Sequence, residues 1–286
     1  MILLTGGTGF VGRHLAARMV EAGEQVRVLA RTRVDLPGAE FCPGDVRDLA
    51  AVVAAARDCQ VVIHLVGIIR ERGGASYHRL HVGGTRTVIQ ACQEAGVGRL
   101  LHMSALGAGP NVHSRYHRTK WEAEELVRAS GLAATIFRPS VIFGQGGAFL
   151  PELRKLLHRG PVIPIVGNGL SLLQPIWVED VISCFAGALG KPETAGQLYE
   201  LGGPEALGFE ELIDLLARQE GISRPKLHLP AVLMRPVVSL LARLLPNFPL
   251  TSDQLTMLLD DNICDITKMR ETFGVEPAPL RDHLND

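Results

Sequence analysis

The chain has 286 residues, of which 47% are hydrophobic and 21% are charged, as in an ordinary globular protein. Its formal net charge of -1 excludes a general nucleic-acid binder, because such proteins carry a basic surplus. The five cysteines are odd in number and form no CxxC pair, so we expect a reducing compartment, with neither a disulfide framework nor a zinc site.

The N-terminus gives a second indication of location. Residues 1–5 form a short apolar run that leads directly into a glycine-rich turn, with no basic segment before it. We therefore expect no signal peptide. The chain also contains no apolar stretch long enough for a membrane-spanning helix. We predict a cytoplasmic protein, with a location peripheral to a membrane as the alternative.

Short apolar runs alternate with segments of helical period through the first half of the chain. Strands are expected at residues 1–5, 25–30, 39–42, 60–66, 98–103 and 132–138, and helices at 10–22, 47–57, 78–96 and 115–130. This alternation predicts βαβ units with right-handed crossovers. Continuous apolar runs are typical of strands that are covered on both faces. The predicted fold is α/β, a Rossmann-type doubly wound parallel sheet.

The pattern changes after about residue 145, where proline and glycine become frequent. Helical patterns return at 178–189, 208–219 and 230–245. We expect a first domain at 1–145 and a smaller C-terminal α/β lobe at 146–286, interleaved with the sheet edge, which binds a substrate or partner. The apolar segment 230–245 contains two arginines and is interrupted by Pro236. It predicts a buried helix of the lobe or, alternatively, one that meets a membrane surface or a partner protein.

A glycine-rich turn joins the first predicted strand to the first predicted helix. Gly6 permits the tight turn, Gly9 lets the backbone approach a pyrophosphate, and Gly12 lets the helix pack close to the strand. The amides at the helix start favour an anion. The turn therefore predicts a dinucleotide site. Its expected contacts are Gly6, Thr8, Gly9, Phe10, Val11 and Gly12.

The residues after the second predicted strand bear on the choice of dinucleotide. NAD-binding proteins place an acidic residue there for the ribose 2′-hydroxyl, whereas this chain has Arg31 and Arg33. Two guanidinium groups suit a 2′-phosphate, so we favour NADP(H). Alternatively, both arginines are solvated loop charges, and the nearby Asp35 serves NAD(H).

Three further residues predict catalytic chemistry. Tyr116 and Lys120 are four positions apart, so they share one face of the predicted helix. An ammonium group beside a phenol stabilises the phenolate and brings its pKa toward neutrality. Lys120 can also bind the nicotinamide ribose. Ser104 follows a predicted strand, at the sheet edge where ligands bind, and is suited to hold a substrate oxygen.

Together these motifs resemble the short-chain dehydrogenase/reductase superfamily, in its extended and atypical branches, over nearly the whole chain. GDVRD (44–48), HLVG (64–67), RPSVIFG (138–144) and WVEDV (177–181) are similar to further segments of that family. The resemblance implies that Asp45 contacts adenine, that residues 64–67 lie along the cofactor, and that residues 138–144 lie beside the nicotinamide. The further cofactor contacts that it implies are Asp45, Val46, Leu65, Val66, Gly67, Lys120, Pro139, Ser140 and Val141.

Finer features are similar to bacterial relatives of the NAD(P)-binding accessory subunit of respiratory complex I. They are HLVGIIRE (64–71), SRYHRTKWEAE (114–124), IFRPSVIFG (136–144) and LTSDQLTMLLDDNIC (250–264). This resemblance implies NADPH that is held structurally. The chain also departs from extended members, whose N-V-x-G-T stretch has an asparagine that supports the lysine through a water. Here His81 takes that place, which leaves the proton relay open.

Other polar residues fit structural roles better than a site. We expect no metal at His113 and His117, and a solvated helix face for Glu122, Glu124 and Glu125. The arginines of residues 70–72 either reach an anionic substrate or belong to a solvated loop.

The sequence favours an enzyme of oxidoreductase or epimerase type, with a dinucleotide and a small-molecule substrate as its ligands and Tyr116 as acid/base. The alternative is a non-catalytic NADPH-binding accessory or assembly protein of a respiratory or quinone-related system. A redox-sensing regulator that binds cofactor and a protein partner is a lesser third hypothesis.

Overall fold

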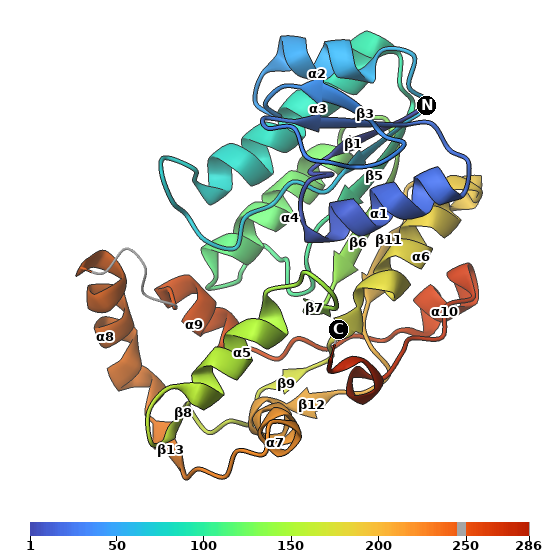
Figure 1. Ribbon diagram of the computed structural model, residues 1–286. Helices are drawn as coiled ribbons and strands as arrows, with labels where there is room; N and C mark the ends of the chain where they lie inside the picture. The colour runs from blue at the N-terminus through green and yellow to red at the C-terminus, as the bar shows by residue number, and fades with distance from the viewer. Residues whose placement is uncertain (245–249, 286) are drawn as a thin grey trace. The chain divides into compact units, whose positions relative to one another are not determined.

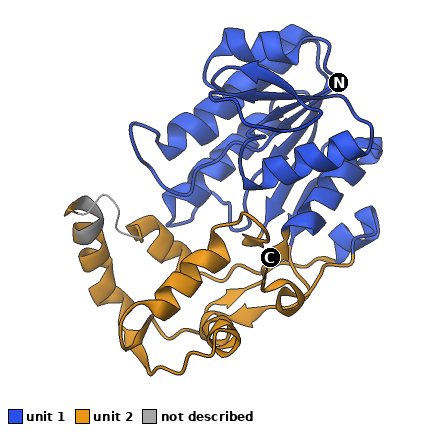
Figure 2. Cartoon of the chain, in the orientation of Figure 1, with its two compact units in different colours: residues 1–139, 178–201, 267–275 blue, residues 140–177, 202–266, 276–286 orange. Residues whose placement is uncertain are grey.

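The computed structural model describes residues 1–244 and 250–285, and within these it describes no side chains for 241–243. The chain forms two compact units (Figure 2). Unit 1 comprises Met1–Pro139, Val178–Leu201 and Thr267–Val275, and unit 2 comprises Ser140–Trp177, Gly202–Ile266 and Glu276–Asp286. The chain enters unit 2 at residue 140, close to the expected boundary at 145, and returns twice to unit 1.

A parallel sheet forms the centre of unit 1 (Figure 1). Within the described residues it has seven strands in the order β11-β6-β5-β4-β1-β2-β3. The strands are β1 (Ile2–Thr5), β2 (Val26–Ala30), β3 (Glu40–Pro43), β4 (Val61–His64), β5 (Arg99–Met103), β6 (Ala133–Pro139) and β11 (Leu198–Leu201). Leu3 and Leu4, neighbours that point to opposite faces, are both fully buried. The predicted Rossmann-type sheet is therefore confirmed.

Helices cover this sheet, and most begin within a few residues of the predicted positions. They are α1 (Phe10–Glu21), α2 (Leu49–Ala56), α3 (Gly84–Ala95), α4 (Arg115–Arg128), α6 (Val178–Leu189) and α10 (Thr267–Phe273). A short 3₁₀ turn, η2 (Pro192–Thr194), follows α6. The expected helix 78–96 is divided, because its first part, η1 (His78–Gly83), is π-helical. Such turns are rare and are often found at functional sites.

The strand β11 was not predicted from the sequence. It is four residues long and pairs in parallel with β6, so it extends the sheet at one edge. Its exposure alternates, with Tyr199 and Leu201 buried and Leu198 and Glu200 partly exposed. In the sequence these four residues do not alternate between apolar and polar, so the strand had no clear signal.

Where it is described, unit 2 contains three small sheets and several helices. Its elements are β7 (Ile142–Phe143), α5 (Phe149–His158), β8 (Ile163–Val166), β9 (Leu172–Leu173), β10 (Ile176–Trp177), β12 (Leu207–Gly208), α7 (Phe209–Gln219), β13 (Lys226–Leu229), α8 (Ala231–Leu244), α9 (Ser252–Leu259) and η3 (Leu280–His283). Strands β7 and β10 pair in parallel, as do β8 and β13, whereas β9 and β12 are antiparallel. Buried leucines of α5 and α7 form much of its core.

The helix α8 is far more exposed than a buried lobe helix would be. Of its described side chains, Val238 is 1% exposed, whereas Val232, Leu233 and Leu240 are 81%, 65% and 57% exposed. The predicted segment 230–245 thus forms a helix whose apolar residues mostly face solvent, and residue 245 lies outside the described residues. No helix in the described ranges is both long enough and apolar enough to cross a membrane.

Candidate functional site

The turn from β1 to α1 is so tight that it requires glycine at two positions. Gly6 has a positive φ of +81°, and a Cβ there would lie 3.0 Å from the backbone of Leu65. A Cβ on Gly12 would lie 2.3 Å from the carbonyl oxygen of Gly6. Any side chain at Gly12 would therefore push the first turn of α1 away from the loop.

The start of α1 leaves its amides available to a ligand. Gly9 is the N-cap, and among the described residues no side chain caps the helix and its first turn holds no acidic residue. The sequence did not single out Arg13, whose Nε donates a hydrogen bond to the carbonyl oxygen of Thr8, at 2.9 Å. A cation at a helix N-terminus is unfavourable unless an anion is bound there. This turn therefore fits a pyrophosphate, as does its glycine cradle.

Arg31, Arg33 and Asp35 are all exposed in the segment that follows β2. The guanidinium of Arg33 lies 6.0 Å from the centre of the Phe41 ring. Both arginines and the aspartate are thus accessible, and their positions are compatible with either NADP(H) or NAD(H).

Asp45 follows β3, and its carboxylate is already held within its own loop. It accepts hydrogen bonds from the backbone amide of Arg47 at 3.0 Å and from its guanidinium at 2.9 and 2.6 Å. The hydrogen bonds from Arg47 lower the pKa of Asp45 to about 2. The neighbouring Val46 is buried. A rigid, ionised Asp45 is compatible with the adenine contact that the resemblance implies.

The residues that follow β4 lie at the carboxyl edge of the sheet. Leu65 is buried, Val66 is partly exposed, and Gly67 is exposed. A Cβ on Gly67 would lie 3.5 Å from Nζ of Lys120 and 3.7 Å from Nε2 of His81. The predicted cofactor segment and the predicted catalytic lysine are therefore neighbours, although they are far apart in the sequence.

Lys120 contacts the end of β5, at the residue that precedes Ser104. Lys120 is buried, and its Nζ donates a hydrogen bond of 2.7 Å to the carbonyl oxygen of Met103. Burial lowers the pKa of Lys120 to about 8, although Glu124 opposes this change. The adjacent Ser104 is 3% exposed, and its Oγ has no hydrogen-bond partner among the described residues. A buried hydroxyl without a partner is costly, so this position fits one that serves a ligand.

Tyr116 lies in the first turn of α4, and Ser114, the N-cap, accepts a hydrogen bond from the amide of His117. The Tyr116 ring is partly exposed and makes edge contacts with three aromatic neighbours. Its ring centre is 5.4 Å from that of His81, 5.8 Å from that of Tyr77 and 5.3 Å from that of His117. These contacts restrict the ring and orient the phenol.

Both ring nitrogens of His81 are engaged. Its Nε2 accepts a hydrogen bond of 3.1 Å from the amide of Ile68, which fixes the tautomer that carries its proton on Nδ1. Nδ1 lies 2.9 Å from the hydroxyl of Thr119, and this hydroxyl lies 3.0 Å from the carbonyl oxygens of Arg115 and Tyr116. Burial and, to a lesser extent, the charge of Lys120 lower the pKa of His81 to about 2. His81 is therefore a neutral link between the loop after β4 and the start of α4.

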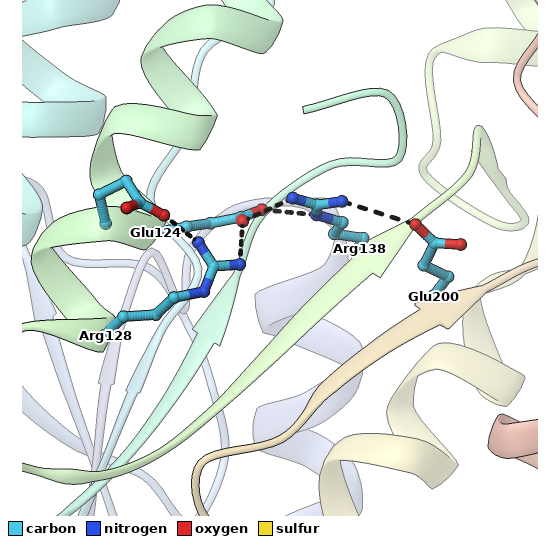
Figure 3. A network of polar contacts seen from close by, with 5 residues as sticks. Glu124, Arg128, Arg138 and Glu200 are labelled. Atoms are coloured by element: carbon cyan, nitrogen blue, oxygen red, sulfur yellow. Dashed lines mark hydrogen bonds and ion pairs between the residues drawn. The ribbon is translucent and has the colours of Figure 1, made fainter. Parts of the chain in front are cut away.

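The prediction of a solvated face for all three glutamates of α4 is wrong for Glu124. Its side chain is fully buried, and its carboxylate binds Arg138 through two hydrogen bonds of 2.8 Å and Arg128 through one of 2.7 Å (Figure 3). Arg138 also approaches Glu200 at 3.6 Å. The helical pattern did not reveal this pairing because Arg138 comes from β6. Glu125 is half exposed, as expected.

Pro139, Ser140 and Val141 span the end of unit 1 and the start of unit 2. Pro139 ends β6, and its carbonyl oxygen accepts a hydrogen bond from the amide of Leu106. In unit 2, the buried Ser140 has its Oγ 2.7 Å from Oδ1 of Asn262. This contact gives the segment 250–264 a structural role. The hydroxyl of Ser140, which was expected to lie beside the cofactor, therefore already has a partner within the protein.

Glu179 stabilises the first helix from a distant part of the sequence. Its carboxylate lies 2.7 Å from Nδ1 of His14 and 3.0 Å from the guanidinium of Arg18. The V-E-D-V segment thus fastens α6 to α1, the helix that carries the phosphate turn. The sequence indicated that this segment matters but not what it contacts.

Two of the remaining candidate segments make contacts within the protein. Glu71 forms an ion pair of 3.1 Å with Arg115 and accepts a hydrogen bond from the amide of Tyr77, so the loop at 70–72 is fastened to α4. His117 is buried against Gly107. No group of three or more histidine, cysteine or acidic residues gathers at a metal-binding distance in the parts of the chain that are described.

Comparison with known proteins adds an independent line of evidence. A family model, the NAD dependent epimerase/dehydratase family, matches residues 2–202. The mitochondrial NADH dehydrogenase [ubiquinone] 1 alpha subcomplex subunit 9 of Arabidopsis thaliana is 30% identical over 223 residues, which cover 74% of this chain and 56% of that protein. The similarity to complex I subunits that the sequence indicated is therefore confirmed, although the chain spans little more than half of this plant relative.

Two further similarities come from an enzyme and a solved structure. The 3β-hydroxysteroid dehydrogenase/Δ5→4-isomerase of Mycobacterium tuberculosis is 30% identical, over 96% of this chain and 86% of the enzyme. The structure of a dTDP-glucose 4,6-dehydratase from Streptomyces venezuelae, a double mutant with NAD bound, has a TM-score of 0.77. It covers 99% of this chain and 94% of its own, at 22% identity, so it supports the fold alone.

Proposed function

The chain belongs to the NAD dependent epimerase/dehydratase family, and from this premise we propose that it is an NADP(H)-dependent oxidoreductase with Tyr116 as its acid/base. The observation that carries the proposal is the convergence of three predicted residues on one small region. Lys120 is buried and anchored at the end of β5, beside the unpartnered Ser104 and one helical turn from Tyr116. A structural lysine has little reason to be buried without a carboxylate in contact with its ammonium group.

In this proposal, the cofactor lies along the carboxyl edge of the sheet of unit 1. The amides of residues 9–12 would hold the pyrophosphate, Arg31 and Arg33 the 2′-phosphate, and Asp45 and Val46 the adenine. Leu65, Val66 and Gly67 would lie along the dinucleotide, and Lys120 would bind the nicotinamide ribose. Pro139, Ser140 and Val141 would lie beside the nicotinamide. When bound, the nicotinamide supplies or accepts a hydride.

The residues of the chain would supply the proton and hold the substrate. In the reducing direction, the Tyr116 hydroxyl donates its proton to the substrate oxygen, and it takes a proton from an alcohol in the reverse direction. The ammonium of Lys120 stabilises the phenolate, because a neighbouring positive charge favours the ionised form. Ser104 Oγ donates a hydrogen bond to the same substrate oxygen. An epimerase would use the same residues for a transient oxidation.

We assign His81 to positioning rather than to proton transfer. Its tautomer is fixed by the Ile68 amide, and its other nitrogen contacts a threonine whose hydroxyl faces helix carbonyls. This series of hydrogen bonds therefore begins and ends at backbone groups. It provides no path by which a proton could pass to solvent. The consequence is that Tyr116 and Lys120 must exchange protons with substrate or solvent by another route.

The second candidate is a non-catalytic NADPH-binding accessory or assembly protein. The blocked relay at His81 favours it, as does the similarity to complex I subunits. The exposed Asp35, close to both arginines in the sequence, keeps NAD(H) as the alternative cofactor. The steroid dehydrogenase relative adds 3β-hydroxysteroids to the substrates to be screened, beside quinones, aldehydes and nucleotide sugars.

The experiment that separates the candidates follows nicotinamide absorbance while these substrates are screened. For an enzyme, Tyr116→Phe lowers kcat about 1,000-fold and leaves the Kd for NADPH within about twofold. Tight NADPH binding without turnover of any substrate would instead support the accessory protein. Full turnover by Tyr116→Phe would contradict the role of the tyrosine.

A further inference from the structure

The helix α8 presents an apolar face that its own unit does not cover. At 100° per residue, positions 232, 233, 237, 240 and 244 fall on one side of the helix, and Val238 falls on another. The five residues on the first side are 45–81% exposed, whereas Val238 is buried. Among the described side chains of α8, Val238 alone is buried, so the helix exposes its broader apolar side. Figure 1 shows the course of α8 in unit 2.

The charges of this segment all have one sign. No acidic residue occurs between Glu220 and Asp253, although the whole chain has slightly more acidic than basic residues. Within α8 itself the charged residues are Arg235 and Arg243, and Arg235 is exposed. Exposed branched aliphatic side chains combined with only basic charge are typical of helices that lie in the headgroup region of a membrane.

We propose that the exposed face of α8 binds the surface of an anionic phospholipid bilayer. Val232, Leu233 and Leu240 would enter the boundary between headgroups and acyl chains, and Arg235 would reach the phosphates while its stem stays among the apolar groups. A protein partner fits less well, because the face carries neither an acidic group nor an aromatic anchor. This inference does not depend on the proposed catalytic function.

The test is cosedimentation of the purified chain with vesicles of phosphatidylcholine, with and without phosphatidylglycerol. We expect binding to the vesicles that contain phosphatidylglycerol, and binding that weakens as salt is added. The triple variant Val232→Gln, Leu233→Gln, Leu240→Gln should bind about 100-fold more weakly, because three apolar side chains lose their burial in lipid. The double variant Arg235→Glu, Arg243→Glu should bind at least about tenfold more weakly.

Matched controls distinguish binding through this face from nonspecific binding by other exposed apolar or basic side chains. Leu170 is 68% exposed outside α8, and Leu170→Gln should bind vesicles as the wild type does. The exposed Arg86 of α3 provides the charge control Arg86→Glu. All three replaced residues of the triple variant are exposed, so its thermal unfolding should match the wild type. Equal binding by the triple variant and the wild type would overturn the proposal. So would a lack of vesicle binding combined with self-association that the triple variant abolishes.

Discussion

The phosphate turn and the region around Tyr116 are built in different ways. The turn is made of consecutive residues. Its shape depends on Gly6 and Gly12, because a Cβ at either position would collide with the backbone. The Tyr116 region gathers side chains from η1, α4 and the residue after β5, and backbone groups from the end of β5 and the loop after β4. Many of these groups are buried and polar. A site made of backbone tolerates changes around it but not at its glycines. A site made of buried side chains depends on partners that are far away in the sequence.

The largest effect should come from the buried carboxylate of Glu124 in α4. Glu124→Ala leaves Arg138 largely buried without its main partner, and it should lower the free energy of unfolding by about 3 kcal/mol. Urea denaturation measures this loss. The control is Glu125→Ala, on the same helix but half exposed, which should cost less than about 1 kcal/mol. Equal losses for the two variants would show that the buried network does not stabilise α4.

Acid should destabilise unit 1 through its buried histidines. Burial lowers the pKa of His64 to about 3 and that of His81 to about 2, and it also lowers the pKa of His102. The unfolded chain takes up these protons below pH 6.5, whereas the folded protein does not, so stability is full above pH 6.5 and falls as the pH decreases. At pH 5 the loss should be about 2 kcal/mol for each of His64 and His81.

Chemical denaturation at a series of pH values measures how steeply the free energy of unfolding changes with pH. His102 has no hydrogen-bond partner for either ring nitrogen among the described residues. The variant His102→Leu therefore removes the proton uptake of this residue in the unfolded chain without breaking a hydrogen bond in the folded protein. The variant should lose stability less steeply between pH 6.5 and 5 than the wild type. Identical slopes would mean that His102 titrates in the folded protein.

The phosphate turn should respond most strongly at Gly12. Gly12→Ala places a Cβ 2.3 Å from the Gly6 carbonyl oxygen, so the turn must open, and NADPH should bind about 100-fold more weakly. Alanine has a higher helix propensity than glycine, so a change in helix propensity cannot explain such a loss of affinity. Gly98→Ala is the control, because its Cβ would have no neighbour within 4 Å in the described structure. Unchanged NADPH affinity for Gly12→Ala, measured by titration calorimetry, would exclude this turn as the phosphate site.

The smallest effect concerns the choice between the two dinucleotides. Arg31→Ala should weaken NADPH binding about tenfold, because one charge-assisted contact with the 2′-phosphate is lost. NADH lacks that phosphate and serves as the control ligand, with an expected change below about twofold. Equal losses for NADPH and NADH would contradict the preference for NADP(H).

The same comparison explains what the sequence could and could not predict. The glycine spacing and the apolar strands are local patterns, so the sheet and the turn at residues 6–12 were predicted from them. The pairing of Glu124 with Arg138 and the contact of His81 with Thr119 join distant segments, and no local pattern specifies them. The strand β11 was missed because its four residues, Leu-Tyr-Glu-Leu, are too few and too irregular in polarity to indicate a strand. In α8, the apolar pattern predicted a helix but not the side that it exposes.

The most direct test is a crystal structure of the chain soaked with NADPH. We predict the pyrophosphate on the amides of residues 9–12, with the nicotinamide ribose on Lys120 and the reactive carbon facing Tyr116 and Ser104. A dinucleotide bound elsewhere, or a turn at residues 6–12 whose amides contact no phosphate, would contradict the account.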